Sequence, residues 1–447
     1  MKRIFFFISL ILGLVACADD DSFSTSTGLR LDFPSDTIKL DTVFSRTASS
    51  TYTFWVNNRN DNGVKLQSVR LKRGNQTGFR VNVDGMYLDN NNGSQTNDVE
   101  IRKNDSVLVV VEITPYETYQ TAPKEITDEL VFLMESGTEQ SVCLKAWAWD
   151  AIKCEQPVIE RDSVIESDKP LVIYGDFIVK EGAHLTIRNT TLYFHADAGM
   201  EVYGTLHTDN CTMRGDRLDR MFSYLPYDRV PGQWKGIRFY NTSNNNVLST
   251  TQIRNSNQGL ICDSAAIDSV SYRLKMQQCV VHNCQGDGVK LTNAHVRLEN
   301  CQLTNAMGDC LNINGGMVEI VYCTLAQFYP FTGGRGAALR FTNQTSPLYH
   351  MMCKGTIITG YDDDVLIGEQ VKDSAAFNYT FAHSLLRTPK IDDTAHFNDI
   401  FWESPNDEIQ GKPISSRLMK TTWNMISTSM LYLQRRDWDV IVKIQRR

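Results

Sequence analysis

The sequence predicts an all-β protein in which a β-sandwich is followed by a parallel β-helix. Two observations carry this prediction. Residues 29–151 read as short strands separated by turn residues, and cysteines recur every 22 residues at positions 279, 301 and 323. The first of these regions lacks the 3.6-residue periodicity of amphipathic helices, which excludes a helical bundle there.

The chain begins with a secretory signal. Basic residues precede a short, almost entirely apolar run from Ile4 to Ala16, which is the layout of a signal peptide and is too short for a membrane span. Leu14–Cys17 resembles a bacterial lipobox, so we expect residues 1–16 to be removed and Cys17 to carry a lipid that anchors the protein in a membrane. The alternative is an ordinary cleaved signal with an incidental cysteine.

Three aspartates follow this cysteine almost directly. Asp19, Asp20 and Asp21 resemble the surface-export signal of Bacteroidota lipoproteins, so the expected location is the outer membrane, with the protein facing the cell exterior. Their alternative role is only to solvate the tether. Residues 17–28 are rich in Asp, Ser and Thr and cannot form a core, which predicts a flexible tether.

Charge limits the classes of partner. The formal net charge is −7, and the sequence before the tail contains no cluster of Lys and Arg, so we expect no nucleic-acid partner. The chain has 11 cysteines, of which one is the expected lipid site. Export would permit disulfides, but the 22-residue spacing of Cys279, Cys301 and Cys323 points to a structural repeat.

The first region, residues 29–151, shows no pattern of a catalytic site. About seven segments alternate apolar and polar residues or form short β-branched runs, and turn residues separate them. The clearest of them are Thr51–Val56, Val64–Leu71, Phe79–Val83, Ser106–Ile113, Leu130–Leu133 and Ser141–Trp149. This spacing predicts a β-sandwich, which we interpret as a spacer or docking module.

The second region, residues 152–410, has an internal period. Segments that start at the three cysteines align with one another, and the residues that repeat are Asn283 with Asn305, Gly286 with Gly308, and Asp287 with Asp309. A repeat of this length allows a parallel β-helix or a leucine-rich horseshoe. The fixed leucines of the horseshoe are missing, while β-branched residues, Asn and Gly dominate, which favours the β-helix.

In such a solenoid each repeat is one coil, and equivalent residues stack ~4.8 Å apart. We expect the three cysteines to form an inward column of small apolar side chains. Disulfides along the column are the alternative, which the parallel direction of neighbouring side chains disfavours. We expect Asn283 and Asn305 to form a polar ladder at a turn, and Gly286 and Gly308 to supply the positive φ of that turn.

A family resemblance sharpens this prediction. Residues 170–187, 192–210 and 231–237, together with the lipobox and the first region, resemble the right-handed β-helix lipoproteins of Bacteroidota. The resemblance covers about residues 1–410. It implies an immunoglobulin-like β-sandwich followed by a right-handed parallel β-helix of the pectate-lyase type, and it implies no settled activity.

Two aspartates are the candidates for catalysis. Asp287 and Asp309 would stack on adjacent coils, and a close carboxylate pair is what glycoside hydrolysis needs. Met307–Leu311 faintly resembles a motif of polygalacturonase-type hydrolases, but Cys310 replaces its second aspartate and Phe331 stands where a histidine is expected. We therefore favour turn caps and a protein that is not an enzyme. A polysaccharide lyase or a polygalacturonase-like hydrolase is the alternative.

Metal and cofactor signals are weak. Asp362, Asp363 and Asp364 form an acidic run that could hold calcium, although such a run is usually a solvated loop. The eight histidines show no metal-type spacing, and the sequence has no nucleotide loop and no serine-hydrolase elbow. We therefore expect no cofactor other than this calcium candidate.

Binding is the function class that we favour. Two long inserts, residues 216–230 and 327–336, would bulge from one flank of the solenoid. The side chains in or beside them that could stack on sugar rings or anchor a protein are Trp234, Tyr240, Phe328, Tyr329, Phe331 and Arg335. Packing of these side chains against the solenoid is the alternative. The expected partner is an extracellular glycan or an outer-membrane protein assembly.

The last segment, residues 411–447, departs from this pattern, since it has neither the period nor the turns of the solenoid. One coding of Thr422–Met430, read in another frame, gives the sequence Leu-Glu-Tyr-Asp-Phe-His, which resembles the ending of the Bacteroidota family. Our hypothesis is a shift of reading frame near residue 411, with poor packing of the tail as its structural consequence. Resequencing of the gene tests it.

Overall fold

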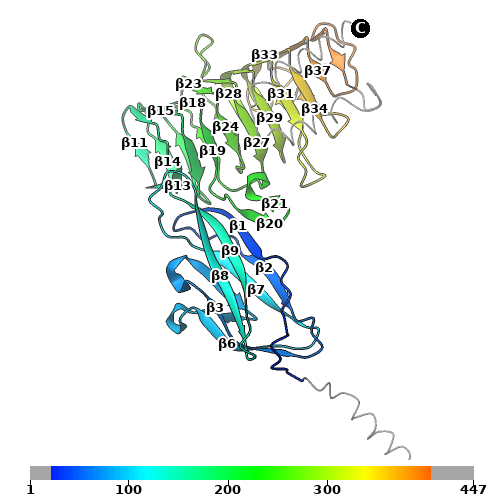
Figure 1. The fold of residues 1–447 in the computed structure, drawn as a ribbon. Coiled ribbons are helices and arrows are strands. Elements are labelled where there is room, and N and C mark those ends of the chain that lie inside the picture. Colours follow the sequence, from blue (N-terminus) through cyan, green and yellow to red (C-terminus); the bar gives the residue numbers. More distant parts are fainter. Residues whose placement is uncertain (1–21, 404–447) are drawn as a thin grey trace, which may run out of the picture. The chain divides into compact units, whose positions relative to one another are not determined.

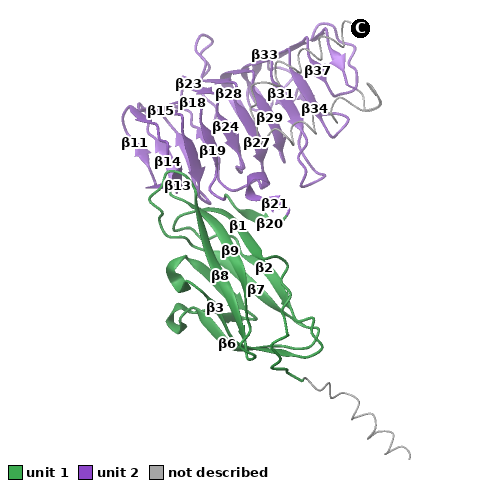
Figure 2. Cartoon of the chain, viewed as in Figure 1, with its two compact units in different colours: residues 1–150, 218–223 green, residues 151–217, 224–447 purple. Residues whose placement is uncertain are grey.

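The computed structural model describes residues 22–403 and divides the chain into two compact units (Figures 1 and 2). The first unit contains the described residues up to 150 together with residues 218–223. The second contains residues 151–217 and those from 224 onward. Each unit is described by itself below.

Several predictions concern parts of the chain outside the described residues. These are the signal peptide of residues 1–16, the lipid on Cys17, the export signal Asp19–Asp21 and the tail of residues 411–447. None of the helices within residues 22–403 is long and apolar enough to cross a membrane.

The first unit is a β-sandwich. One sheet has the strand order β1-β9-β8-β3-β6 and the other β2-β7-β4-β5. Their bounds are β1 (Thr37–Phe44), β2 (Tyr52–Asn57), β3 (Val64–Leu71), β4 (Phe79–Val83), β5 (Met86–Tyr87), β6 (Gln95–Ile101), β7 (Ser106–Ile113), β8 (Lys124–Met134) and β9 (Glu139–Trp149), with the 3-10 helices η1 (Gly74–Gln76) and η2 (Asn90–Asn92) and a further strand, β20 (Arg220–Phe222). In β7, alternate residues are buried, and they join one core cluster with residues of both sheets.

Strand prediction succeeded where apolar residues alternate and missed polar edge strands. The predicted segments Val64–Leu71 and Phe79–Val83 are β3 and β4 with the same bounds. The missed strand β6 has the sequence Gln-Thr-Asn-Asp-Val-Glu-Ile and pairs only with β3 at the sheet edge. Edge strands are commonly polar because one side has no partner strand, and the apolar alternation is therefore weak.

The second unit consists almost entirely of short strands. Their bounds are β10 (Ile152–Glu155), β11 (Val158–Ile159), β12 (Ser163–Ile165), β13 (Leu171–Tyr174), β14 (Asp176–Val179), β15 (His184–Arg188), β16 (Thr191–Phe194), β17 (Gly199–Val202), β18 (Thr205–Asp209), β19 (Thr212–Gly215), β21 (Leu225–Pro226), β22 (Ile237–Phe239), β23 (Asn246–Ser249), β24 (Gln252–Arg254), β25 (Leu260–Cys262), β26 (Leu274–Gln277), β27 (Val280–Cys284), β28 (Val289–Glu299), β29 (Gln302–Ala306), β30 (Leu311–Val321), β31 (Thr324–Gln327), β32 (Leu339–Thr342), β33 (Leu348–Lys354), β34 (Ile357–Gly360), β35 (Leu366–Glu369), β36 (Phe377–Ala382), β37 (Leu385–Leu386), β38 (Phe397–Asn398) and β39 (Phe401–Trp402), with the 3-10 helix η3 (Tyr227–Arg229).

These strands stack as the coils of a parallel β-helix (Figure 1). One 11-stranded sheet runs β10-β13-β16-β19-β24-β27-β29-β31-β34-β37-β39, and a 17-stranded sheet takes most coils in two strands separated by a bend. The pairing is parallel, and Val280 lies beside Gln302, which lies beside Thr324, so each coil here advances the chain by 22 residues. The two sheets enclose one apolar core. The predicted fold class, all-β with a parallel β-helix, is confirmed.

Each coil therefore turns three corners, which we name by their content. The ladder corner leads from the 17-stranded sheet into the 11-stranded sheet. The insert corner leads back out of the 11-stranded sheet and includes residues 307–310, 328–338 and 361–365. The bend corner lies within the 17-stranded sheet and includes residues 240–245 and 263–273. Long connections are confined to the insert and bend corners of the described coils.

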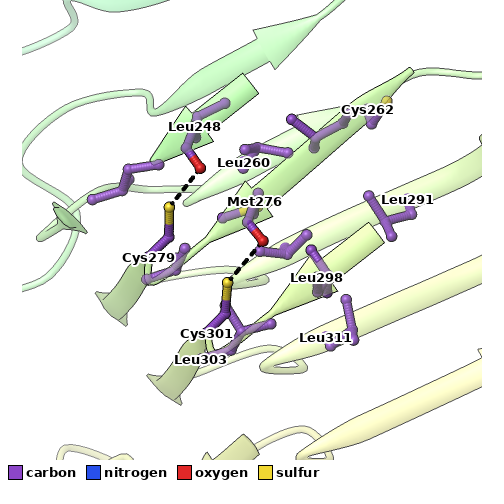
Figure 3. Close-up of a cluster of buried hydrophobic side chains, with 14 of the residues drawn as sticks. Leu248, Leu260, Cys262, Met276, Cys279, Leu291, Leu298, Cys301, Leu303 and Leu311 are labelled. Carbon is purple, nitrogen blue, oxygen red and sulfur yellow. Dashed lines mark hydrogen bonds between the residues drawn. The ribbon is translucent and has the colours of Figure 1, made fainter. Parts of the chain in front are cut away.

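A column of small side chains occupies the ladder corner. Each member directly precedes a strand of the 11-stranded sheet on a successive coil, and the members are Thr190, Cys211, Thr251, Cys279, Cys301, Cys323, Thr356 and Ser384. Each donates a hydrogen bond to the carbonyl oxygen two residues earlier, as from Thr190 to Arg188 (2.8 Å) and from Cys301 to Glu299 (3.4 Å). Figure 3 shows second acceptors, the carbonyl oxygens of Leu248 and Met276, beside Cys279 and Cys301. The inward column is therefore longer than the 22-residue repeat reveals.

The cysteines of this column are free thiols. All ten cysteines within the described residues are free, so the disulfide alternative is wrong. Cys279 and Cys301 are fully buried, and burial raises the pKa of the Cys279 thiol well above its ordinary value. Thiols in this condition pack as small apolar groups and react slowly, because the reactive thiolate is suppressed.

The prediction that Gly286 and Gly308 supply a positive φ was wrong. Positive φ occurs at Asn283 (60°) and Asn305 (57°), not at Gly286 and Gly308. Asn tolerates the left-handed region because its short side chain bonds locally. The glycines are required for close approach instead: a Cβ at Gly308 would lie 2.4 Å from Asp287 Oδ1, and one at Gly286 would lie 2.1 Å from the Gln258 side chain.

Candidate functional site

The aspartate pair lies at the insert corner, directly before β28 and β30. The backbone N–H of Asp309 donates to Asp287 Oδ1 (2.9 Å), and that of Ala337 donates to Asp309 Oδ1 (2.7 Å). Arg340 Nε donates to Asp309 Oδ2 (2.8 Å). The Asn312 amide then spans both carboxylates, 3.2 Å from Asp287 Oδ2 and 3.1 Å from Asp309 Oδ2. The structure thus brings the two predicted residues together.

These hydrogen bonds use both carboxylates to hold neighbouring coils together. Asp309 is only 5% exposed, and three donors already engage its two oxygens. Burial raises the pKa of the Asp287 carboxyl, and the charge of Asp309 acts in the same direction. Burial by itself lowers the pKa of Arg340, but its hydrogen bond to Asp309 and the negative charges of Asp309, Glu369 and Asp287 together outweigh burial, so the pKa of Arg340 is raised. A general acid or nucleophile needs an oxygen that reaches substrate, and this arrangement offers little of Asp309 for that purpose.

Sequence reasoning missed the basic and amide partners of this pair. Lys290, Asn312 and Arg340 occupy equivalent positions on three successive coils of the 17-stranded sheet. Asn312 follows Lys290 by 22 residues, but Arg340 follows Asn312 by 28 because the insert lengthens that coil. A fixed 22-residue step therefore could not find Arg340. Allowing for the insert at 327–336 would have been the available signal.

The predicted aromatic residues of the second insert divide into buried supports and exposed rings. Phe328 and Tyr329 are buried, whereas Phe331 is 46% exposed. The Phe331 ring meets the Tyr329 ring edge-on, with centroids 5.5 Å apart. The exposed ring of Tyr361, from the next coil, meets Phe328 in the same way at 5.1 Å. Each exposed ring is therefore braced by a buried one.

Arg335 joins this group through its guanidinium, which lies 4.7 Å from the centre of the Tyr361 ring. The same group donates to the Tyr329 carbonyl oxygen (3.2 Å) and lies 3.5 Å from Asp362 Oδ2. We call Phe331, Tyr361 and Arg335 the aromatic flank. The pairing of Arg335 with a ring and a carboxylate fixes the orientation of the flank.

The other two predicted aromatic residues lie elsewhere. Trp234 is fully buried, stacks on Phe194 with centroids 4.2 Å apart, and donates its indole N–H to the Arg254 carbonyl oxygen (2.9 Å). Its ring therefore packs in the solenoid. Tyr240 lies in the bend corner, stacked on Tyr203 at 4.1 Å. Burial and its polar neighbours raise the pKa of Tyr240.

The acidic run that could hold calcium is paired with other groups. Asp362 faces Arg335, and Asp363 Oδ1 lies 3.3 Å from Arg387 Nη2. Asp364 accepts a hydrogen bond from the backbone N–H of Leu366 (3.2 Å). No group of three or more metal-ligating side chains was found within residues 22–403. The three side chains thus point to different partners.

A buried charged group beneath the first insert was not predicted. Arg214 and Arg254 lie on adjacent coils of the 11-stranded sheet, and Asp228 of the insert bridges them at 2.6 Å and 3.5 Å. On the next coil, His282 Nδ1 forms a hydrogen bond with Thr304 Oγ1 (2.7 Å). Burial, and secondarily Arg254, lowers the pKa of His282 to about 4. The insert thus neutralises one charge of an otherwise repulsive pair of arginines.

Comparison with known proteins supports the fold of this region. Residues 172–325 match the family described as "Right handed beta helix region". Apart from residues 218–223, the matched segment belongs to the second unit, and it contains both aspartates of the pair. No curated protein matches the chain.

Three solved structures share distant similarity with the chain. The catalytic unit of a thermostable GH87 alpha-1,3-glucanase from Streptomyces thermodiastaticus strain HF3-3 is 12% identical, with a TM-score of 0.32 over 82% of this chain and 92% of that chain. A GH87 alpha-1,3-glucanase catalytic domain in complex with tetrasaccharides is 8% identical, with a TM-score of 0.32 over 83% and 88%. A family 123 glycoside hydrolase from Clostridium perfringens is 7% identical, and the match spans 30% of each chain with a TM-score of 0.20. Similarity at this level transfers no activity.

Proposed function

We propose that this chain is a lipid-anchored protein of the outer membrane, exposed at the cell surface, whose β-helix binds an extracellular glycan without cleaving it. The observation that carries the proposal is the state of the aspartate pair, since Asp309 is buried and its oxygens accept hydrogen bonds from Ala337, Asn312 and Arg340. An acid pair that holds two turns together has little capacity left for acid and base chemistry.

The aromatic flank supports a glycan as the ligand. Sugar rings present C–H faces that pack against aromatic side chains, and the hydroxyl groups around them need donors and acceptors. Phe331 and Tyr361 offer two exposed rings, and Arg335 and Asp362 lie beside them. The buried rings of Phe328 and Tyr329 hold these side chains in place, which lowers the entropy lost on binding.

Binding to an immobilised glycan panel tests the ligand. We expect Phe331→Ala to weaken binding about 10-fold, or ~1.4 kcal/mol, because it removes one stacking ring. Tyr349→Ala is the matched control, since Tyr349 is similarly exposed on β33, outside the insert corner. Equal affinities for the two variants would contradict the aromatic flank as the binding site. Release of reducing or unsaturated sugar ends by the purified protein would favour the polysaccharide lyase or hydrolase instead.

Labelling of cells tests the anchor and the location. We expect a radioactive fatty acid to label the full-length protein and not a Cys17→Ala variant, because the lipid would be attached to that thiol. Replacement of Asp19, Asp20 and Asp21 by alanine should retain the lipid but protect the protein from protease added to intact cells. Co-purification with an outer-membrane protein in the absence of any bound glycan would replace the glycan by a protein assembly as partner.

A further inference from the structure

A recess lies at the bend corner of the β-helix, whereas the aspartate pair and the aromatic flank belong to the insert corner. Its volume is about 400 Å³, within the range of small-ligand sites. It lies between two loops, the one that connects β22 to β23 and the one that connects β25 to β26. Its lining residues include Asn241, Asn245, Ala266, Asp268, Ser271 and His295.

The walls of this recess are tied together by Arg273. This side chain is buried, and its guanidinium donates to the carbonyl oxygens of Ser243 (2.9 Å), Tyr240 and Asp263. Two of these acceptors belong to the first loop, whereas Arg273 itself ends the second loop. A side chain that bonds both loops holds the recess open in one shape. Its positive charge is also surrounded by carbonyl dipoles, which leaves it less able to attract an anion.

The floor of the recess is formed by His295 and Tyr272. His295 Nδ1 lies 2.8 Å from the Asp268 carbonyl oxygen and 3.1 Å from that of Ser271. Both are acceptors, so Nδ1 carries a hydrogen and donates to them. The Tyr272 ring lies 4.2 Å from the His295 ring, and its hydroxyl donates to Glu319 Oε1 (3.0 Å). Both rings are therefore fixed in orientation.

The lining favours a neutral ligand that is rich in hydroxyl groups. The amides of Asn241, Asn244 and Asn245 and the hydroxyl of Ser271 line the recess. Asn245 Nδ2 donates to Asn244 Oδ1 (3.0 Å), and Asn244 Nδ2 donates to the Thr242 carbonyl oxygen (3.2 Å), but a side-chain amide has two N–H donors and two acceptor lone pairs, so each keeps hydrogen-bonding capacity for a ligand. The carboxylate of Asp268 brings a negative charge, and Arg273, the cation among the lining residues, is engaged by backbone carbonyls. This balance disfavours a phosphate, a sulfate or a uronate. Small apolar side chains, such as Ala266, suit the C–H face of a sugar.

We propose that this recess is a second binding subsite and that it takes a neutral sugar unit. The inference rests on the proposed function, because it names the class of sugar that a glycan-binding β-helix would hold at the bend corner. It adds a site to the aromatic flank and assigns roles to Asn241, Ser271, Tyr272 and His295, which no sequence motif indicated.

Calorimetric titration of the purified protein with cellopentaose, mannopentaose and pentagalacturonate tests the subsite. We expect at least one neutral pentasaccharide to bind. Ala266→Trp should weaken it more than 10-fold because the indole fills the recess from an exposed position, and Asn241→Ala should weaken it about threefold. Ser269→Trp is the matched control, since Ser269 is exposed on the same loop but does not line the recess. Its affinity should equal that of the unaltered protein.

The outcomes separate the two proposals. Unchanged binding by Ala266→Trp, with loss of binding by Phe331→Ala, would overturn the subsite and leave the proposed function in place. Preference of the recess for pentagalacturonate, seen as its loss in Ala266→Trp, would also overturn the subsite as a neutral one. Failure of the unaltered protein to bind any glycan would overturn the proposed function itself. Equal thermal unfolding of Ala266→Trp and Ser269→Trp confirms that both variants are folded.

Discussion

The ladder corner and the insert corner of the β-helix solve the same problem in opposite ways. Both turn the chain from one sheet to another on every coil. The ladder corner repeats one device, a small side chain that bonds a carbonyl oxygen two residues earlier, from Thr190 to Ser384. The insert corner uses connections of different lengths and fixes them with side chains from other coils, such as Asp309 and Arg340. A uniform corner stacks, whereas a varied corner can carry a binding site.

The difference teaches where variation is tolerated in a solenoid. At the ladder corner each residue contacts its equivalents on adjacent coils, so a long insertion would interrupt the column. At the insert corner the stack is maintained by a few anchoring contacts, and the chain between them is free to differ. The chain leaves the stack after β31, and it re-enters at Gly336 and Ala337, whose backbone N–H groups donate to the Met307 carbonyl oxygen (2.9 Å) and to Asp309 Oδ1 (2.7 Å).

The largest effect should come from breaking an anchor of the insert corner. Asp309→Ala removes a buried carboxylate that pairs with Arg340 and accepts from Ala337, and it leaves their polar groups without that partner. We expect a loss of about 3–5 kcal/mol in the free energy of unfolding, measured by urea denaturation. Asp364→Ala is the control, because Asp364 is exposed and accepts a single hydrogen bond from Leu366; its cost should stay within about 1 kcal/mol. Equal costs would show that Asp309 is not an anchor.

A smaller loss of stability should follow when the pH is lowered, because of His282, which pairs with Arg254 on the adjacent coil. Burial lowers the pKa of His282 from its ordinary 6.5 to about 4, so between these values the unfolded chain binds a proton that the folded chain does not. The stabilisation is complete above pH 6.5 and is lost as the pH falls towards 4, by about 2 kcal/mol. Urea denaturation at pH 7 and pH 4.5 measures it. A His282→Asn variant with the same pH dependence as the unaltered protein would contradict this assignment.

The smallest loss of stability should come from replacing one small residue of the ladder corner by another. Cys301→Thr places at this coil the residue that already occupies the column at Thr251 and Thr356, so its cost should stay below about 1 kcal/mol. Cys301→Leu adds volume to a fully packed column and should cost about 1–3 kcal/mol. Thermal unfolding of both variants checks this comparison. If Cys301→Thr were as unstable as Cys301→Leu, threonine and cysteine would not be equivalent at the ladder corner.

Much of the fold could be predicted because solenoid geometry is encoded locally. Alternation placed Val64–Leu71 in a strand, and the 22-residue step placed Cys279, Cys301 and Cys323 in one inward column. The same step could not extend the column to Thr356, which follows Cys323 by 33 residues because an insert intervenes. In the candidate site too, only residues related by the 22-residue step could be found from the sequence. Asp287 and Asp309 were found by repetition, while Tyr361 was not.

What the sequence by itself determined is the repeating part of this protein: an all-β chain, a parallel β-helix and the inward direction of its small side chains. These properties depend on residues that contact their own repeats, and a one-dimensional period describes such contacts. The tertiary structure decided which glycine or asparagine takes the positive φ, which aromatic rings are exposed, and that Arg340 engages Asp309. Those outcomes depend on how inserts of unequal length re-enter the stack, and hydrogen bonds across coils form only once that packing is fixed.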